Sequence, residues 1–460
     1  TITVTNTPSI TATFTAGNGF VVTGSTVAYT LAGALNIPIL TAVTSGNNYN
    51  NLTISGNTGS NKTFTGSTTF TIGGTLTTSN SSSGSLILNS TSTARTITIG
   101  TWNHSSGSVD FGTTDDAGAS GFTATVNITS TLNKTGGTFT NSASADFYRI
   151  NFSGTTASIS NSGTFQYPSI YINSGTTATL NTALTLTSPL SAALTIDGVL
   201  IVGSNSITAT TTGASRVITL NGTLRTSNTN GLIGAANTTI VNTNSPTLTL
   251  NSGSTVEYNG ASQSITGRTD YKNVTISGSG TNTISGTITI AGTLTLTSGT
   301  LAIGPNTLTL NGGYIAGTVN NLTTTSSSNL VLNTTIGGTL PNFTAINNLT
   351  CNSTGNTFIL NSSPTISGAL TLTSGKLNID ANTLTLAGTV SGMSATNCLV
   401  TNNAATNSNL IVNGNLGGSI FFDQTNDANR SSSKGTNALA DLTLGASGNL
   451  IFGNKVNLFG

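Results

Sequence analysis

The residues that could do chemistry are few and widely separated in this chain. Charged residues make up 5% of its 460 positions, and 12 Lys and Arg nearly balance 11 Asp and Glu. Asp115 and Asp116, in FGTTDDAGAS, are the only adjacent carboxylates, and Asp110 is nearby. These three are the candidate Ca²⁺ ligands, but they lack the alternating oxygen ligands of a dedicated calcium loop. A solvated turn is the simpler interpretation, so we expect no metal and no other cofactor.

The single histidine and the single tryptophan lie together in GTWNHSSGSVD. One histidine cannot form a multi-histidine metal site, and a Ser-His-Asp triad would need it buried and oriented. We therefore expect His104 to be an exposed turn residue. Trp102 is expected to pack on a loop or a rung edge rather than stack on a sugar.

The densest mixed-charge stretch is FFDQTNDANRSSSKG, which contains Asp423, Asp427, Arg430 and Lys434. It interrupts a repeating pattern, so we predict a loop insertion near 422–436. These four residues are candidates for a contact between subunits, and a solvated loop is the alternative. Polysaccharide lyases and hydrolases on β-helices need clustered carboxylates. Because no such cluster is recognisable, we predict that the chain is not an enzyme, with a polysaccharide-active enzyme kept as an alternative.

Charge and hydropathy exclude two further classes. The net charge is +1, and Lys62, Arg95, Lys134 and Arg149 occur singly, whereas a nucleic-acid binder needs a basic stripe. No run of about 18 apolar residues exists, so no transmembrane helix is expected. The chain begins at Thr1 without a basic and apolar leader. We therefore expect a secreted mature product or fragment whose signal peptide is absent from this chain.

Hydrophobic periodicity is the main structural signal. Leu294/Leu296, Leu301/Ile303 and Leu308/Leu310 form apolar-polar-apolar triplets that follow each other every seven residues. Period two places alternate side chains on opposite faces of a strand. Such short strands become stable when the chain coils, so that each strand pairs with its equivalent one turn later. We predict an all-β fold, a right-handed parallel β-helix (β-solenoid) of about 20 to 22 residues per rung. A string of Ig-like sandwiches is the alternative, but the turns come too often for it.

The rungs recur as longer repeats. GTLTLTSGTLAIGPNTLTLNG (292–312) aligns without a gap with GALTLTSGKLNIDANTLTLAG (368–388), and a weaker copy covers 182–203. Cys351 and Cys398 are the only cysteines, and we expect buried small apolar residues rather than a disulfide. The solenoid repeats are expected to occupy 46–460.

Residues 1–45 have a different pattern, with longer alternating strands such as TITVTNTPSITATFTAG. We predict a distinct N-terminal β segment. It either caps the open end of the solenoid or adds a strand to a neighbouring molecule. In the second case Thr1, Ile2, Thr3 and Val4 are candidate assembly residues.

One recurring phrase resembles a family. STVEYNGASQSITGRTDYKNVTISGSGTNTISGTITIAGTLTLTSG (254–299) is similar to tandem repeats in large secreted proteins of Bacteroidetes. Looser openings occur at Tyr49 to Thr53, Asn347 to Thr350 and Tyr148 to Asn151. The resemblance implies a surface or adhesin-like β-solenoid of the type IX-secreted kind. It carries over no catalytic residue, and the C-terminal sorting domain of that system is not recognisable here.

Threonines recur at outward positions, among them Thr293, Thr295, Thr307, Thr309, Thr371, Thr373, Thr383 and Thr385. Such ranks are used by some ice-binding proteins, but Thr is also the commonest outward strand residue. We predict an extracellular structural protein of a bacterial surface, a rod-like subunit that forms a filament by self-association or serves as an adhesin stalk. The alternatives are a monomeric adhesin that binds glycans or host and abiotic surfaces, a polysaccharide-active enzyme, and an ice-binding protein.

Overall fold

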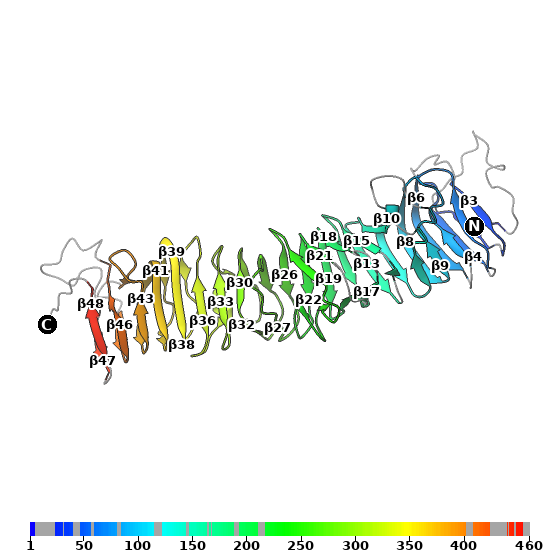
Figure 1. The fold of residues 1–460 in the computed structure, drawn as a ribbon. Coiled ribbons are helices and arrows are strands. Elements are labelled where there is room, and N and C mark those ends of the chain that lie inside the picture. Colours follow the sequence, from blue (N-terminus) through cyan, green and yellow to red (C-terminus); the bar gives the residue numbers. More distant parts are fainter. Residues whose placement is uncertain are drawn as a thin grey trace. The chain divides into compact units, whose positions relative to one another are not determined.

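The fold is all-β and every strand pairing in the described part of the chain is parallel. The computed structural model describes residues 1–4, 24–30, 32–39, 47–56, 59–80, 84–114, 122–143, 147–162, 165–166, 168–187, 193–209, 217–401, 408–423, 439, 441–445 and 448–453. Strands stack on their equivalents from one turn of the chain to the next, which is a parallel β-solenoid as predicted. The stacked arrows of each part are visible in Figure 1.

The chain divides into two compact units. Unit 1 comprises Thr1–Asn228 and Leu232–Ser254, and unit 2 comprises Thr229–Gly231 and Thr255–Gly460. Among the described residues the only helix is a 3-10 turn, η2 (Val319–Asn321). No described helix has the length and apolarity to cross a membrane.

Unit 1 is built from stacked rows of short strands. One sheet contains β3 (Leu35–Pro38), β5 (Lys62–Thr65), β7 (Ser85–Ile87), β9 (Ser108–Asp110), β11 (Thr138–Thr140), β14 (Phe165–Gln166), β17 (Leu184–Thr187), β20 (Ile207–Ala209), β24 (Ile240–Val241) and β23 (Ile233–Gly234). The other strands are β1 (Ile2–Val4), β2 (Thr26–Tyr29), β4 (Asn51–Gly56), β6 (Thr69–Asn80), β8 (Arg95–Ser106), β10 (Phe122–Lys134), β12 (Phe147–Phe152), β13 (Thr156–Asn161), β15 (Pro168–Ile172), β16 (Thr177–Leu180), β18 (Ala193–Ile196), β19 (Val199–Gly203), β21 (Val217–Leu220), β22 (Thr223–Thr226) and β25 (Thr247–Leu250).

The three longest of these strands turn a corner of the solenoid. The first half of β10 pairs with β12 and its second half with β13, so the one strand belongs to two rows. The register of β6 against β8 shifts between Ile72 and Thr75, where Gly73 and Gly74 follow each other. A side chain at Gly74 would overlap the backbone oxygen of Asn50, at 2.8 Å from a Cβ. Glycine therefore lets consecutive rungs approach at this corner.

Unit 2 repeats the same construction. Its first two sheets contain β26 (Thr255–Tyr258), β28 (Asn273–Ile276), β31 (Leu294–Leu296) and β34 (Ala316–Gly317), and then β27 (Ser264–Ile265), β29 (Thr281–Ile284), β32 (Thr300–Ala302) and β35 (Leu322–Thr323). The third contains β30 (Ile288–Ile290), β33 (Thr307–Leu310), β36 (Asn329–Leu332), β37 (Gly338–Thr339), β39 (Asn348–Ile359), β41 (Ala369–Asn378), β43 (Thr389–Ser391) and β44 (Leu399–Val400). The last two contain β38 (Ala345–Ile346), β40 (Thr365–Ile366), β42 (Thr383–Leu386), β45 (Asn409–Val412) and β47 (Asp441–Leu444), and β46 (Asn415–Ile420) with β48 (Asn449–Phe452).

The predicted triplets coincide with the rows of unit 2. Leu294 and Leu296 lie in β31, Leu301 in β32, and Leu308 and Leu310 in β33, which belong to three different sheets. All five leucines are buried, and the threonines between them face outward. The alternation of apolar and polar residues therefore fixes which side of each short strand faces the interior.

Rung length differs between the units. In unit 2 the register pairs Leu308 with Leu330, Leu330 with Leu349, Leu349 with Leu370 and Leu370 with Val390, which are 19 to 22 residues apart. This agrees with the predicted length. In unit 1, Ile97 pairs with Val126, which is 29 residues later, because longer connections separate the strands there.

The described parts of residues 1–45 are strands that pair in the same parallel manner. β1 pairs with β2, with Ile2 opposite Val27 and Val4 opposite Tyr29, and β2 pairs with β4. β3 pairs with β5 in the neighbouring sheet. Whether this segment caps a rod or joins two molecules stays a prediction.

Both cysteines are buried free thiols, as expected. Cys351 lies in the row between Leu332 and Leu372, in the place of an interior leucine. Burial raises the pKa of Cys351 to about 12, so the thiol stays protonated and unreactive at neutral pH. It acts as a small apolar residue in the core.

Candidate functional site

Asp110 is a buried acceptor at the end of β9. Its Oδ1 atom accepts the backbone N–H of Gly112 at 3.1 Å and that of Ser142 at 3.0 Å. Its Oδ2 atom accepts the hydroxyl of Ser142 in a short hydrogen bond. The side chain thus joins two rungs, and protein donors already occupy both oxygens. Asp115 and Asp116 lie outside the described residues, and the described residues hold no group of three potential metal ligands.

Asp423 is also buried, at 7% exposure, and it forms an ion pair. Lys376 Nζ, in β41, lies 2.8 Å from its Oδ2 atom. The backbone N–H of Asp423 bonds to Leu399, which pairs in turn with Leu377, so the ion pair spans two rungs. The carboxylate therefore stabilises contacts within the chain. Asp427, Arg430 and Lys434 lie outside the described residues.

The prediction of an exposed turn around Trp102 and His104 is wrong. Both residues lie in β8 and face the interior, where Trp102 is 0% and His104 is 1% exposed. The Trp102 ring stacks on Phe139 at a centroid distance of 4.7 Å. Gly, Asn and Ser flank the pair and favour turns in isolation. Parallel pairing with β6 and β10 holds the segment as a strand, which overrides this local preference.

A hydrogen-bond chain links these two side chains through Thr78. Trp102 Nε1 donates to Thr78 Oγ1 at 3.0 Å, and Thr78 Oγ1 lies 2.8 Å from His104 Nδ1. Because the indole is only a donor, the threonine oxygen accepts from it and can donate its own hydrogen to the histidine. This arrangement suits a neutral imidazole. Burial, followed by the charge of Lys134, lowers the pKa of His104 to about 4.

Four polar residues form a buried column through successive rungs of unit 1. Thr78 pairs with His104, His104 with Lys134, and Lys134 with Asn161. Lys134 Nζ donates to the carbonyls of Gly137 at 2.7 Å and Ser162 at 3.0 Å. It also lies 5.7 Å from the centre of the Phe139 ring. Burial lowers the pKa of Lys134 to about 8.

Two further cations are buried in unit 1. Arg95 Nη1 donates to the carbonyls of Phe64 at 2.9 Å and Leu88 at 2.7 Å. Lys62 is 1% exposed and faces inward between Leu35 and Leu86. Burial lowers the pKa of both side chains. The sequence analysis did not identify these cations as core residues. Their position two residues from Phe64 and Ile97, on the inward side of the alternation, was the available signal.

These buried groups are suited to holding the rungs together. Their side chains are closed off from solvent, and their hydrogen bonds go to backbone carbonyls or to one another. A substrate cannot reach a sealed imidazole or ammonium group. The column therefore stabilises a particular register, because a slipped strand would leave buried donors without acceptors.

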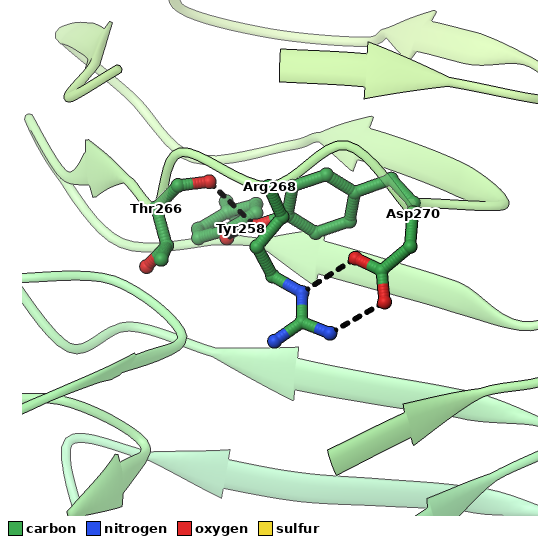
Figure 2. A network of polar contacts seen from close by, with 5 residues as sticks. Tyr258, Thr266, Arg268 and Asp270 are labelled. Atoms are coloured by element: carbon green, nitrogen blue, oxygen red, sulfur yellow. Dashed lines mark hydrogen bonds and ion pairs between the residues drawn. The ribbon is translucent and has the colours of Figure 1, made fainter. Parts of the chain in front are cut away.

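The phrase that carries the family resemblance forms a corner in unit 2. Tyr258 and Tyr271 are both buried, and their hydroxyl oxygens lie 2.6 Å apart. Tyr271 also donates to the carbonyl of Thr266 at 3.0 Å. Figure 2 shows Tyr258, Thr266, Arg268 and Asp270 around this corner, where Arg268 and Asp270 form a two-pronged ion pair of 2.9 and 2.6 Å. Burial raises the pKa of Tyr258 to about 12, so both phenols remain protonated at physiological pH.

The asparagine that follows this tyrosine holds the next rung. Asn273 Oδ1 accepts the backbone N–H of Thr293 at 2.9 Å. Before it, Ala291 and Gly292 donate to the carbonyls of Tyr271 and Lys272. A Cβ at Gly292 would lie 2.3 Å from Asn273 Oδ1. The Tyr-x-Asn segment and the Gly-Thr-Leu segment of the next rung are therefore complementary.

The same corner recurs at two other places. Asn51 Oδ1 accepts the N–H of Thr75 at 2.9 Å, and Gly74 donates to Asn50. Asn348 Oδ1 accepts the N–H of Ala369 at 2.7 Å, and Gly368 donates to Asn347. Each corner pairs an Asn-hydrophobic-Thr strand with a following glycine. The recurring phrase thus has a structural role in joining consecutive rungs.

The fold and these corners define the chain as a parallel β-solenoid stabilised by repeated side-chain contacts between rungs. Comparisons with family models, curated proteins and solved structures find no match.

Proposed function

We propose that the chain is a structural protein of a bacterial cell surface, which associates with further copies by adding parallel strands at its open rung edges. The observation that supports this most strongly is the exposure of apolar side chains at inward positions. Leu442 and Leu444 in β47 are 37% and 53% exposed, and Ile451 in β48 is 56% exposed. Their counterparts one rung earlier, Leu410 and Val412, are fully buried.

The backbone has the same open character at these strands. β47 pairs with β45 and β48 with β46, and no other described strand pairs with either of them. In unit 1, β1 pairs with β2 only, and Ile2 is 36% exposed. An unpaired strand edge with exposed apolar residues is a template for pairing with another chain. The low charge of the protein also gives little repulsion between copies.

Sedimentation velocity over a range of concentrations tests this proposal. The wild-type protein is expected to form larger species as its concentration rises. Leu444→Asp combined with Ile451→Asp places charge on the open edge and is expected to suppress them. Ile336→Asp is the matched control, because Ile336 is 55% exposed but lies outside β47 and β48. A wild-type protein that stays monomeric, or a double variant that associates like the control, contradicts the proposal.

A further inference from the structure

One side of unit 2 is an extended surface without formal charge. It is the outward side of β33, β36, β39, β41 and β43, between Thr307 and Ser391, and we call it the polar face. Between Lys272 and Lys376 the sequence contains no Asp, Glu, Lys, Arg or His. Lys376, in the second half of β41, directs its ammonium to Asp423. The polar face therefore offers hydrogen-bonding groups but no charge.

Side chains on the polar face stand in register from rung to rung. Thr309, Val331, Thr350, Thr371 and Ser391 occupy one row, each opposite the next. The interior residues on either side of them in the strands are buried, so this row faces outward. Neighbouring rungs of a sheet lie about 4.8 Å apart. The row thus repeats polar groups at a short, regular interval.

A second row is fixed by hydrogen bonds between its own side chains. Asn333 Nδ2 donates to Asn311 Oδ1 at 3.0 Å, and Asn352 Nδ2 donates to Asn333 Oδ1 at 3.2 Å. Ser374 Oγ continues the ladder to Asn352 Oδ1 at 2.8 Å. Asn311 and Asn352 are exposed. Each amide has a second N–H, and its orientation is set before any partner arrives, so little rotamer entropy remains to be lost on binding.

We infer that the polar face binds a neutral polysaccharide. Sugar hydroxyls donate and accept hydrogen bonds, as do the amides and hydroxyls of this face. A charged glycan would lose hydration there without meeting an opposite charge. Single contacts of this kind are weak, but they add up along a partner that repeats as the rungs do. Val331 and Ala369 interrupt the polar rows. The apolar C–H face of a sugar ring can cover them, whereas an ice lattice cannot bond to them. This inference does not depend on the proposed self-association.

Co-sedimentation with microcrystalline cellulose, chitin and cross-linked dextran tests the inference. The protein is expected to bind at least one of these three, and to bind it equally well in low salt and in about 1 M NaCl, because no charge is involved. Asn333→Asp combined with Asn352→Asp keeps the side-chain shapes but adds charge and breaks the ladder. This variant is expected to bind about tenfold more weakly.

Asn361→Asp is the matched control, because Asn361 is exposed in a turn outside the polar face. It is expected to bind like the wild type, and thermal unfolding of all variants confirms that they are folded. Absence of binding to all three polysaccharides overturns the inference, as does equal binding by the double variant and the control. Incorporation into growing ice without polysaccharide binding overturns it too, and assigns the face to a water lattice.

Discussion

Asn273 Oδ1 and the backbone N–H of Thr293 form a 2.9 Å hydrogen bond that joins two consecutive rungs of unit 2. The same contact joins Asn51 to Thr75 and Asn348 to Ala369. In each case a glycine directly precedes the donor, and a Cβ there would overlap the asparagine side chain. The contact explains why asparagine and glycine recur in the repeats, because each rung carries half of a joint and the next rung carries the other half.

Replacing the glycine at this joint is expected to destabilise the solenoid. In Gly292→Ala the new Cβ would lie 2.3 Å from Asn273 Oδ1 and 2.8 Å from the carbonyl oxygen of Lys272. Relief of this overlap requires the rungs to separate, which costs about 1–3 kcal/mol. Gly286→Ala is the control, because its nearest neighbour would be at 3.6 Å and its φ is not positive. Urea unfolding measures the difference, and equal midpoints for the two variants would contradict the account of the joint.

The spacing of the triplets was enough to predict the stacked parallel strands, the inward leucines and the rung length of unit 2. It did not show that the two best repeats occupy different sheets. Leu294 pairs with Val274, whereas Leu370 pairs with Leu349 in the sheet of β33 and β36. The separation of the repeats is therefore not a whole number of rungs. The chain tolerates this because each side of the solenoid presents the same kind of apolar interior to its strands.

The buried polar column could not be predicted in the same way. His104 and Lys134 come into register only through pairing across 30 residues, and the intervening connection has a length that no local pattern specifies. Turn-forming neighbours of Trp102 and His104 also obscured the strand. Interior leucines follow from composition and period, but a buried charge depends on the one register that supplies its carbonyl acceptors.

Acid is expected to destabilise unit 1 through His104. Its folded pKa of about 4 is below the unfolded value of about 6.5, so the unfolded state binds the proton more strongly. The stability is therefore fully present above pH 6.5 and falls as the pH decreases toward 4, by an amount on the order of 2–3 kcal/mol. His104→Gln removes this titration and serves as the baseline for the carboxylates. Urea unfolding followed by Trp102 fluorescence measures it, since Trp102 is the only tryptophan and contacts the same threonine. Identical pH profiles for the two proteins would show that the imidazole is not buried as described.

The tyrosine pair is expected to act as a unit. Tyr271→Phe removes the hydrogen bonds to Tyr258 and to the carbonyl of Thr266, which should cost about 1–3 kcal/mol. Tyr258→Phe should cost less, because Tyr271 keeps its bond to Thr266. A double-mutant cycle on these two positions should give a coupling energy of about 0.5 kcal/mol or more. Strict additivity of the two changes would argue against a direct contact between the hydroxyls.

Loss of the ion pair across two rungs should weaken the last part of unit 2 locally. Asp423→Asn leaves the Lys376 ammonium without its carboxylate, and the partner side chain is 27% exposed, so solvent compensates part of the loss. Hydrogen exchange is expected to accelerate at Leu399 and Asp423, whose backbone N–H groups bond to the adjoining rungs. Exchange in β28 should not change, and acceleration there as well would indicate global rather than local destabilisation.

Cryo-electron microscopy of the protein at a concentration that gives large species tests the central proposal most directly. The account predicts that copies join by parallel strand pairing, with a strand of the next copy placed on the free edge of β47 or β48 at the usual interstrand spacing of about 4.8 Å. Leu444 and Ile451 should then be buried against that strand. Assemblies in which copies touch only through their outward threonine and asparagine rows, with Leu444 and Ile451 still exposed to solvent, would contradict it.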